Sequence, residues 1–364
     1  MTAIADLPDG MRAVLLTGNG GFDRLDYRDD VPVPRPGSDE VLIRVAAAGV
    51  NNTDINTRTA WYSRSVASAT DVGGEQGFAE ARPEDSGWTG AVPHFPRIQG
   101  ADACGRIIAV GDGVSASRIG SRVIVEPVFR AECAPLESAI YFGSERDGGF
   151  AEFAVAPSRH AHAIDCKWSD AELASIPCAY SAAENMLSRA GLAAGETVLV
   201  TGASGGVGSA AVQLAKRRGA RVIAVVGADK AGVVRSIGAD QTIDRGADLP
   251  GAIGRDSVDV VVDVVGGAVF DTLLQLLKRG GRYAVAGAIA GPIVSLDLRT
   301  LYLKDLRLLG CTVIAPTVFT NLVSYIERGE IRPLVAATYP LADIVRAQQA
   351  FLEKAHIGKI VLIC

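Results

Sequence analysis

The stretch TVLVTGASGGVGSAAVQLAK, residues 197–216, decides the fold of this chain. A short apolar run leads into the glycine-rich turn Ala203-x-Gly205-x-x-Gly208, and a helical pattern follows the turn. A G-x-G-x-x-G variant between a strand and a helix is typical of dinucleotide binding, because the glycines let the backbone approach a pyrophosphate. The helix that follows offers free N–H groups and the positive end of its dipole. A tight turn without a ligand is the alternative. The predicted dinucleotide site consists of Ser204, Gly205, Gly206, Val207 and Gly208.

The sequence around this stretch alternates between strands and helices from about residue 170 to residue 290. Nearly continuous Val and Ile strands between helices specify a parallel sheet that is covered on both faces. The pattern therefore predicts an α/β fold with a doubly wound parallel sheet. We expect one long helix over residues 170–195, ended by Gly195.

The N-terminal part of the chain has a different pattern. Residues 11–160 contain short apolar runs separated by Gly and Pro turns, which is typical of a β-rich barrel or sandwich. Residues 66–92 lose this periodicity and gain Gly, Asp and Glu. They are expected to form a long loop insertion, and long ordered loops are often functional. A chain of 364 residues exceeds the usual single core. We place the β-rich domain at residues 1–160 and 315–364, and the dinucleotide domain at residues 161–314.

Composition and charge exclude several classes of function. The net charge of −5 argues against nucleic acid and against an anionic membrane surface as partner. No apolar run reaches the roughly 20 residues that span a bilayer, and the N-terminus lacks the basic and apolar regions of a signal peptide. We therefore predict a cytoplasmic protein. The six cysteines form no C-x-x-C pair and are expected to be reduced thiols. His160 and His162 are expected to be solvated surface residues.

The end of the second strand bears on the choice of dinucleotide. Sites specific for NAD usually place Asp or Glu there to bind the ribose 2′-OH, whereas this strand ends Val225-Val226-Gly227. Lys230 follows, and a cation at this point suits the 2′-phosphate of NADPH, which we favour over NADH. Asp229 supports NADH as the alternative cofactor, because its carboxylate could turn towards the ribose. Lys230 could equally be an ordinary solvated helix charge.

Two later strands also end in small residues, at 263–267 and 286–288. The C-terminal ends of parallel strands line the ligand crevice, so the backbone at these positions is expected to contact the nicotinamide. Close helix packing explains any single glycine there equally well. The residues assigned to this contact are Val265, Gly266, Ala286 and Gly287.

A polar stretch, GVNNTDINTRTAWY at residues 49–62, directly follows a probable strand of apolar residues. A surface turn does not need so many side chains that can donate or accept hydrogen bonds. We interpret the stretch as an active-site wall, and it contains neither histidine nor cysteine.

The order of parts, from a β-rich domain to a dinucleotide domain with GGVG and back, resembles the medium-chain dehydrogenase/reductase superfamily. The resemblance rests on VLIRVAAAGVNNTD, DGGFAEFAVAPS, ASIPCAYSAAENML, GASGGVGSAAVQLAK, VRSIGAD, DVVVDVVGG and GKIVLI, and it covers almost the whole chain. It implies a GroES-like catalytic domain and a Rossmann-type cofactor domain.

The same resemblance bears on metal binding. Zinc alcohol dehydrogenases of this superfamily carry three catalytic ligands, and here those positions hold Asn51, Ala101 and Cys178. Asp102 stands where these enzymes have a glutamate, and the structural-zinc lobe is reduced to Cys133. Because a catalytic zinc needs about three protein ligands, we predict a site without zinc.

Metal-free branches of the superfamily resemble quinone oxidoreductases, zeta-crystallins and enoyl-thioester reductases. Several of these place a tyrosine eight residues after an acidic position, and Asp54 and Tyr62 have this spacing. Asn52 and Ala60 replace the proline and glycine that are usual nearby. The resemblance implies that Tyr62 stabilises an enolate or delivers a proton. A half-buried tyrosine that covers the insertion is the alternative.

The resemblance also suggests roles for neighbouring residues. Asn51 and Asn56 are expected to be further hydrogen-bond donors. Thr53 is expected to bind cofactor or substrate rather than relay an alcohol proton. Asp54 is expected to hold a turn or an interdomain hydrogen bond rather than act as a base. Lys359 is expected to reach the cofactor phosphates across the cleft, with a surface lysine as the alternative.

These observations favour an NADPH-dependent reductase of quinones or α,β-unsaturated carbonyl compounds, with a small electrophilic substrate. The alternatives are a zinc-free dehydrogenase that interconverts an alcohol and a carbonyl, and a non-catalytic NADPH-binding protein of the zeta-crystallin type. Residues 306–314 fall where relatives pair edge strands, so we predict a homodimer. The insertion, with Trp88 and nearby Phe95, is expected to cap the pocket, but the sequence does not identify the substrate.

Overall fold

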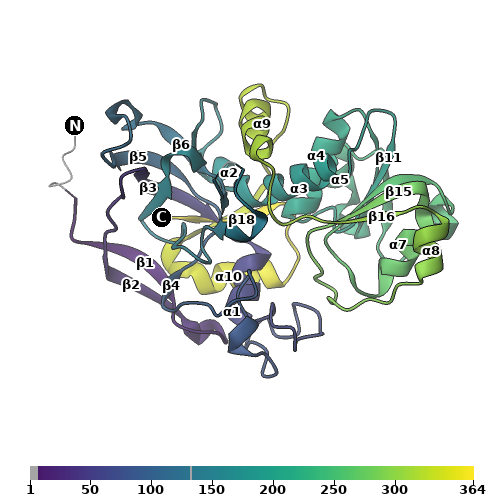
Figure 1. The fold of residues 1–364 in the computed structure, drawn as a ribbon, viewed down its shortest axis with the longest axis horizontal. Coiled ribbons are helices and arrows are strands. Elements are labelled where there is room, and N and C mark those ends of the chain that lie inside the picture. Colours follow the sequence, from purple (N-terminus) through teal and green to yellow (C-terminus); the bar gives the residue numbers. More distant parts are fainter. Residues whose placement is uncertain (1–6, 132) are drawn as a thin grey trace.

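The computed structural model describes residues 7–131 and 133–364, which fold into two lobes (Figure 1). The first six residues, which hold most of the stretch used to exclude a signal peptide, lie outside this description. The catalytic lobe combines the N-terminal strands with the C-terminal strand β18, and the cofactor lobe holds the strands from β11 to β16. Within the described residues, no helix is both long enough and apolar enough to cross a membrane.

The cofactor lobe is a six-stranded parallel sheet in the order β13-β12-β11-β14-β15-β16. Val198 and Val200 belong to the core on one face of the sheet, and Leu199 belongs to the core on the other. Both faces are therefore apolar, as a doubly wound sheet requires, and the predicted α/β class is confirmed. The strands are β11 (Thr197–Val200), β12 (Arg221–Val226), β13 (Gln241–Asp244), β14 (Val258–Asp263), β15 (Leu277–Val285) and β16 (Arg307–Gly310). The helices are α3 (Pro177–Arg189), α4 (Gly206–Arg217), α5 (Ala231–Ser236), α6 (Leu249–Ile253), α7 (Phe270–Leu276) and α8 (Leu298–Leu303).

The catalytic lobe contains a seven-stranded sheet, a three-stranded sheet and a two-stranded ribbon, which confirms the predicted β-rich, GroES-like domain. In the largest sheet β3 pairs with β5, β9 and β18. Val361 on β18 lies opposite Gly49 on β3, so the C-terminal strand lies beside the strand that precedes the polar stretch. The strands are β1 (Gly10–Leu16), β2 (Leu25–Pro32), β3 (Glu40–Gly49), β4 (Arg97–Ile98), β5 (Cys104–Val110), β6 (Arg122–Val125), β7 (Val128–Phe129), β8 (Ile140–Tyr141), β9 (Phe153–Pro157), β10 (Ala161–Ala163), β17 (Val335–Pro340) and β18 (Lys359–Ile363). The helices are α1 (Asn52–Thr59), α2 (Asp170–Ala174) and α10 (Ile344–Leu352). A further helix, α9 (Pro316–Glu327), packs against α3 of the cofactor lobe.

The single long helix predicted over residues 170–195 is wrong, because this segment forms the two helices α2 and α3. α3 begins at Pro177. A proline has no N–H to donate and its ring clashes with the preceding turn, so it is tolerated in the first turn of a helix and breaks a helix interior. α3 also ends before the predicted stop at Gly195.

The two histidines predicted to be solvated lie instead around a buried carboxylate. His160 Nδ1 lies 2.8 Å from Glu126 Oε2, and His162 Nε2 lies 3.1 Å from the same oxygen. His160 and Glu126 are both buried. The antiparallel pairing of β10 with β6 brings Glu126 to the histidines. This neighbour is 34 residues away from His160 in the chain, so the local sequence does not indicate it.

Candidate active site

A cleft of about 460 Å³ lies between the two lobes. The glycine-rich turn and the ends of β14 and β15 form one side, and the polar stretch and the loop before β18 form the other. The residues predicted for the site that line this cleft are Asn51, Thr53, Tyr62, Gly205, Gly206, Val207, Gly208, Ala286, Gly287 and Lys359. The residues predicted for the site that lie outside this lining are Ser204, Lys230, Val265 and Gly266.

The glycine-rich turn has the shape that a pyrophosphate needs. α4 begins at Gly206, and no side chain caps the N–H groups of its first turn at the edge of the cleft. A Cβ on Gly208 would lie 2.1 Å from Gly202 O, so only glycine lets the helix pack this closely against the turn. A Cβ on Gly205, which lines the cleft, would approach Gly202 O at 3.5 Å, an ordinary contact. The residues present therefore fit the phosphate groups of a dinucleotide.

The end of β14 is organised around the buried carboxylate of Asp263. This carboxylate accepts hydrogen bonds from the backbone amides of Val265 at 2.8 Å and Gly266 at 3.1 Å, and from two nearby hydroxyls. The two amide groups are therefore engaged within the protein, and the contact of these residues with the nicotinamide stays a prediction. Val264 lines the cleft in their place.

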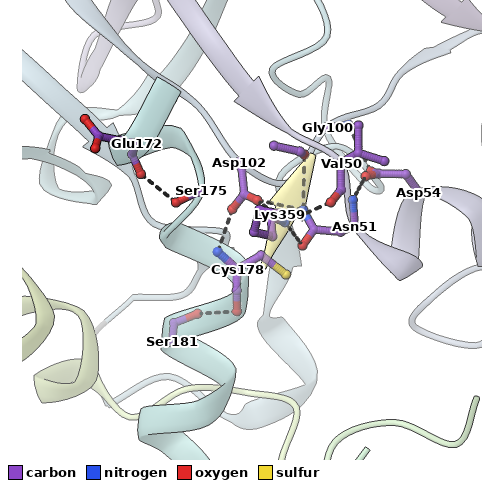
Figure 2. Close-up of polar contacts among 11 residues, drawn as sticks. Val50, Asn51, Asp54, Gly100, Asp102, Glu172, Ser175, Cys178, Ser181 and Lys359 are labelled. Carbon is purple, nitrogen blue, oxygen red and sulfur yellow. Dashed lines mark hydrogen bonds and ion pairs between the residues drawn. The ribbon is translucent and has the colours of Figure 1, made fainter. Parts of the chain in front are cut away.

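Asn51, at the first of the three zinc-ligand positions, belongs to a buried hydrogen-bond network (Figure 2). Its Nδ2 donates to Asp102 Oδ2 at 2.7 Å and to Gly49 O at 3.2 Å. Its Oδ1 accepts from Lys359 Nζ at 2.5 Å. Both amide hydrogens are used, so Asn51 does not offer the substrate the donor that was predicted. The side chain thus anchors the cap residue of α1, whose backbone N donates to Asp54 Oδ2 at 2.7 Å.

Lys359 makes contacts other than the predicted ones with cofactor phosphates. Its ammonium group donates to Val50 O at 2.9 Å, to Asn51 Oδ1 and to Asp102 Oδ2 at 2.9 Å. Three acceptors use the three hydrogens of the ammonium group. The buried Asp102 carboxylate is the counter-charge, and it also accepts from Cys178 N at 2.6 Å. These three acceptors leave the ammonium group no hydrogen for a phosphate, so the predicted contact stays a prediction that this network opposes.

The donor set at the three zinc-ligand positions does not fit a zinc ion. Asn51 is committed to the network, and Ala101 has no side-chain donor atom. Burial, together with the nearby Asp102 carboxylate, raises the pKa of the Cys178 thiol, whereas zinc binds the thiolate and needs about three protein ligands. Within residues 7–131 and 133–364, no group of three His, Cys, Asp or Glu side chains is arranged to hold a metal ion.

Tyr62 and Thr53 form a hydroxyl pair in the wall of the cleft. Ala60 ends α1 in the left-handed conformation, with a φ of 62°, and the chain turns so that the Tyr62 hydroxyl donates to Thr53 Oγ1 at 3.2 Å. Burial raises the pKa of Tyr62 to about 12, because an apolar environment disfavours the phenolate. The phenol is therefore protonated at neutral pH and can donate a hydrogen bond.

Asp54 holds the start of α1, which is one of its two predicted roles. Its Oδ2 accepts from Asn51 N at 2.7 Å, and its Oδ1 accepts from Gly100 N at 3.3 Å. Burial raises the pKa of Asp54 to about 7, although these two hydrogen bonds oppose the rise. Both partners lie in the catalytic lobe, so the alternative prediction of an interdomain hydrogen bond is wrong.

Two residues of the cleft wall, Lys354 and His356, carry no clear signal in the sequence. Both lie in the loop between α10 and β18. Lys354 Nζ lies 3.9 Å from the centre of the Phe351 ring and donates to Asn52 Oδ1 at 3.3 Å. Burial lowers the pKa of Lys354 to about 8. Burial and the neighbouring lysine charges lower the pKa of His356 to about 4, so its ring is neutral.

Lys230 supports this loop from behind. Its ammonium group donates to Lys354 O and to His356 O, the latter at 3.3 Å. Two of its three hydrogens are therefore committed to the backbone, whereas the predicted contact was with a 2′-phosphate. Lys354 and Lys359 are lysines that line the cleft, whereas Lys230 is outside its lining. The local sequence pointed to Lys230 only because it follows the second strand.

Comparison with known proteins agrees with this geometry. A model of the alcohol dehydrogenase GroES-like domain matches residues 37–165, and a model of the zinc-binding dehydrogenase family matches residues 206–328. The acryloyl-coenzyme A reductase of Metallosphaera sedula is 30% identical, over 97% of this chain and 99% of its own. The quinone oxidoreductase of Lama guanicoe is 29% identical, over 97% of each chain. A solved structure from Sinorhizobium meliloti 1021, provisionally named an alcohol dehydrogenase, is 47% identical, with 98% of this chain and 97% of its own covered and a TM-score of 0.88.

Proposed function

The chain belongs to the medium-chain dehydrogenase/reductase superfamily, in its quinone oxidoreductase-like branch, and we propose that it is a zinc-independent, NADPH-dependent reductase of quinones or α,β-unsaturated carbonyl compounds. Its relatives make it an oxidoreductase; the cofactor, the independence from zinc and the substrate class are our proposal. The observation that carries it is the Tyr62–Thr53 hydroxyl pair, which lines the same cleft as the glycine-rich turn.

A reduced nicotinamide bound at the glycine-rich turn would supply the hydride, with its two electrons, to the β-carbon of the conjugated bond. We place the carbonyl oxygen of the substrate at the Tyr62 hydroxyl, where negative charge develops as the bond is reduced. A preorganised donor at such a position contributes on the order of 3 kcal/mol to the transition state. Thr53 accepts from this phenol in the structure, and its own hydroxyl can donate to the phenol once Tyr62 turns towards the substrate. Tyr62 or water then adds the proton at the α-carbon.

The cations beside the cleft support NADPH as the dinucleotide. Lys354 lines the cleft and Lys230 lies behind the same loop. Val226, at the end of β12, offers no carboxylate for a ribose 2′-OH. Asp229 is the competing feature, because it is exposed shortly after this strand. Parallel assays with NADPH and NADH distinguish these two readings.

The test of the proposed function is NADPH oxidation by chelator-treated protein against enones, enoyl thioesters, quinones and simple aldehydes. We expect turnover of quinones or conjugated carbonyls, unchanged after zinc is added back. Turnover of aldehydes alone would replace the proposal with a zinc-free alcohol dehydrogenase. Absence of turnover with every electrophile, although NADPH binds, would identify a non-catalytic binding protein. Activity that depends on added zinc would contradict the proposed independence from zinc.

We also propose that a second copy of the chain covers the free edge of the cofactor sheet. β16 ends the sheet, and it is shorter than the predicted stretch of residues 306–314. An edge strand with free backbone groups and apolar neighbours suits pairing between two copies. The exposed apolar side chains on and near this strand are Ile293, Val294, Leu298, Tyr302, Leu303 and Leu308.

A further inference from the structure

The insertion at residues 66–92 is tied to the end of α1 at several points. Trp61 Nε1 donates to Ser68 O at 2.9 Å, and Ser63 Oγ donates to Asp85 Oδ1 at 2.7 Å. The Arg82 amide returns a hydrogen bond to Ser63 Oγ at 2.9 Å. The only regular element in the insertion is the short 3₁₀ turn Pro83–Asp85. Side-chain contacts therefore hold it as a wall of fixed shape, although it has no strand or α-helix.

The insertion also spans the two sides of the cleft. Thr70 N donates to Ile289 O at 3.0 Å, and Ile289 belongs to the cofactor lobe and lines the cleft. On the catalytic side, the buried Arg58 of α1 donates from Nη2 to Gly74 O at 2.7 Å. The helix that carries Thr53 is thus joined directly to the insertion, and the insertion closes the cleft beside the hydroxyl pair.

The part of the insertion that faces the cleft is Trp88. Its indole stacks on the Tyr141 ring at a centroid distance of 4.1 Å, and it lies parallel to the Tyr62 ring, with centroids 6.5 Å apart and an interplanar angle of 3°. Trp61 stands edge-on to Tyr62 at 5.7 Å. The ring of Tyr62 is therefore flanked by flat aromatic surface, which stacks best on flat conjugated molecules.

This end of the cleft carries no charge among its lining residues, which are Asn56, Trp61, Tyr62, Trp88, Pro127 and Val128. The lysines that line the cleft already have partners: Lys354 donates to Asn52 Oδ1 at 3.3 Å, and Lys359 is paired with Asp102 at 2.9 Å. A carboxylate or phosphate on the substrate would lose its hydration against the aromatic wall without gaining a counter-charge. The wall therefore disfavours charged substrates.

We infer that the insertion makes the substrate end of the cleft selective for flat, uncharged, ring-bearing conjugated carbonyls, such as quinones and aryl enones, and that Trp88 is the residue that selects them. This inference rests on the proposed function and narrows its substrate class. It ranks ring-bearing substrates above small aliphatic enals and above acryloyl thioesters, whose flexible chains gain little from stacking.

The test compares kcat/KM for 1,4-naphthoquinone and benzylideneacetone with values for acrolein and acryloyl-coenzyme A. In the wild type the two ring substrates are expected to be preferred. Trp88→Ala is expected to lower kcat/KM for them about twofold to twelvefold, since aromatic stacking contributes about 0.5–1.5 kcal/mol, and to leave the acrolein value unchanged. Trp88→Phe is expected to recover part of the loss, which separates stacking from a folding defect.

Val72→Ala is the matched control, because Val72 lies in the same insertion with 72% of its surface exposed, and it should leave all four values unchanged. Equal losses for ring substrates and acrolein in Trp88→Ala, or a wild-type preference for acryloyl-coenzyme A, would overturn the inference and leave the proposed reductase intact. Absence of turnover with all four compounds, although NADPH binds, would overturn both.

Discussion

Replacement of Lys359 by methionine is expected to destabilise the protein strongly. Its ammonium nitrogen lies 2.9 Å from Asp102 Oδ2, and the two side chains are only 4% and 0% exposed. Coulomb attraction at this distance is about 6 kcal/mol with an effective dielectric constant of about 20, and desolvation of the two charges opposes it. The variant leaves the carboxylate buried with two hydrogen-bond donors and no counter-charge. The expected loss is about 3–5 kcal/mol of unfolding free energy.

Urea denaturation followed by circular dichroism measures this loss as a lower midpoint at an unchanged slope. The matched control is Lys216→Met, because the Lys216–Asp240 pair is closer, at 2.5 Å, but its side chains are 47% and 35% exposed. Exposed pairs contribute about 0–1 kcal/mol. The double variant Lys359→Met/Asp102→Asn should be more stable than Lys359→Met alone, since it removes the buried unpaired charge.

Two results would contradict this reasoning. A loss in Lys359→Met no larger than that of the surface control would show that Asp102 does not depend on this cation. Unchanged stability combined with a tenfold or greater weakening of NADPH binding would restore the contact with cofactor phosphates that the network geometry argues against.

Three further predictions concern the cleft and the sheet edge. Tyr62→Phe is expected to lower kcat for enone reduction about 100-fold, the loss typical of one preorganised donor. Because the pKa of Tyr62 is about 12, ionisation of the phenol should not lower the wild-type kcat between about pH 6 and pH 9. A kcat of Tyr62→Phe equal to that of the wild type would contradict the proposed role of the phenol. Lys354→Met should weaken NADPH binding about tenfold at pH 7. Because the pKa of Lys354 is about 8, its side chain is charged below that pH and neutral above it, so the NADPH affinity of the wild type in fluorescence titrations should fall as pH rises through 8. The same pH dependence in the variant would assign the effect to another group. Leu308→Glu, on the exposed edge strand, should convert a dimer into a monomer in light scattering, and a wild-type monomer at micromolar concentration would remove the proposed assembly.

The cofactor lobe could be predicted from the sequence because its signals are local. The glycine-rich turn lies between an apolar run and a helical pattern within residues 197–216, and Gly208 has a reason that a short segment reveals, the contact with Gly202 O. Tyr62 and Thr53 could each be assigned to the site for the same reason, since both belong to one polar stretch, but the hydrogen bond between them was not predicted. Residues that are neighbours in the sequence were therefore enough to predict the fold of the cofactor lobe and several residues of the cleft.

The partners of the charged side chains could not be predicted, because pairing across the sheet creates them. Asp102 and Lys359 are 257 residues apart, and they meet because β3 pairs both with β18, which begins at Lys359, and with β5, which Asp102 precedes. The same cause brings Glu126 to two histidines through the pairing of β10 with β6. A lysine before a strand and an aspartate after a glycine look like surface residues until the register of the sheet is known.

The buried ion pair and the hydroxyl pair together explain how this cleft could act without a zinc ion. In the network, Lys359 pairs with the Asp102 carboxylate, and the side-chain amide of Asn51 forms hydrogen bonds with both of these residues. Internal hydrogen bonds therefore occupy the side chain at the first zinc-ligand position. The charge that develops on a substrate oxygen must then be met by another group. The nearby phenol of Tyr62 remains protonated because burial raises its pKa to about 12. A fixed α1, held at its N-terminus by Asn51, keeps Thr53 in place to orient that phenol, so loss of Lys359 should lower catalysis through α1 as well as stability.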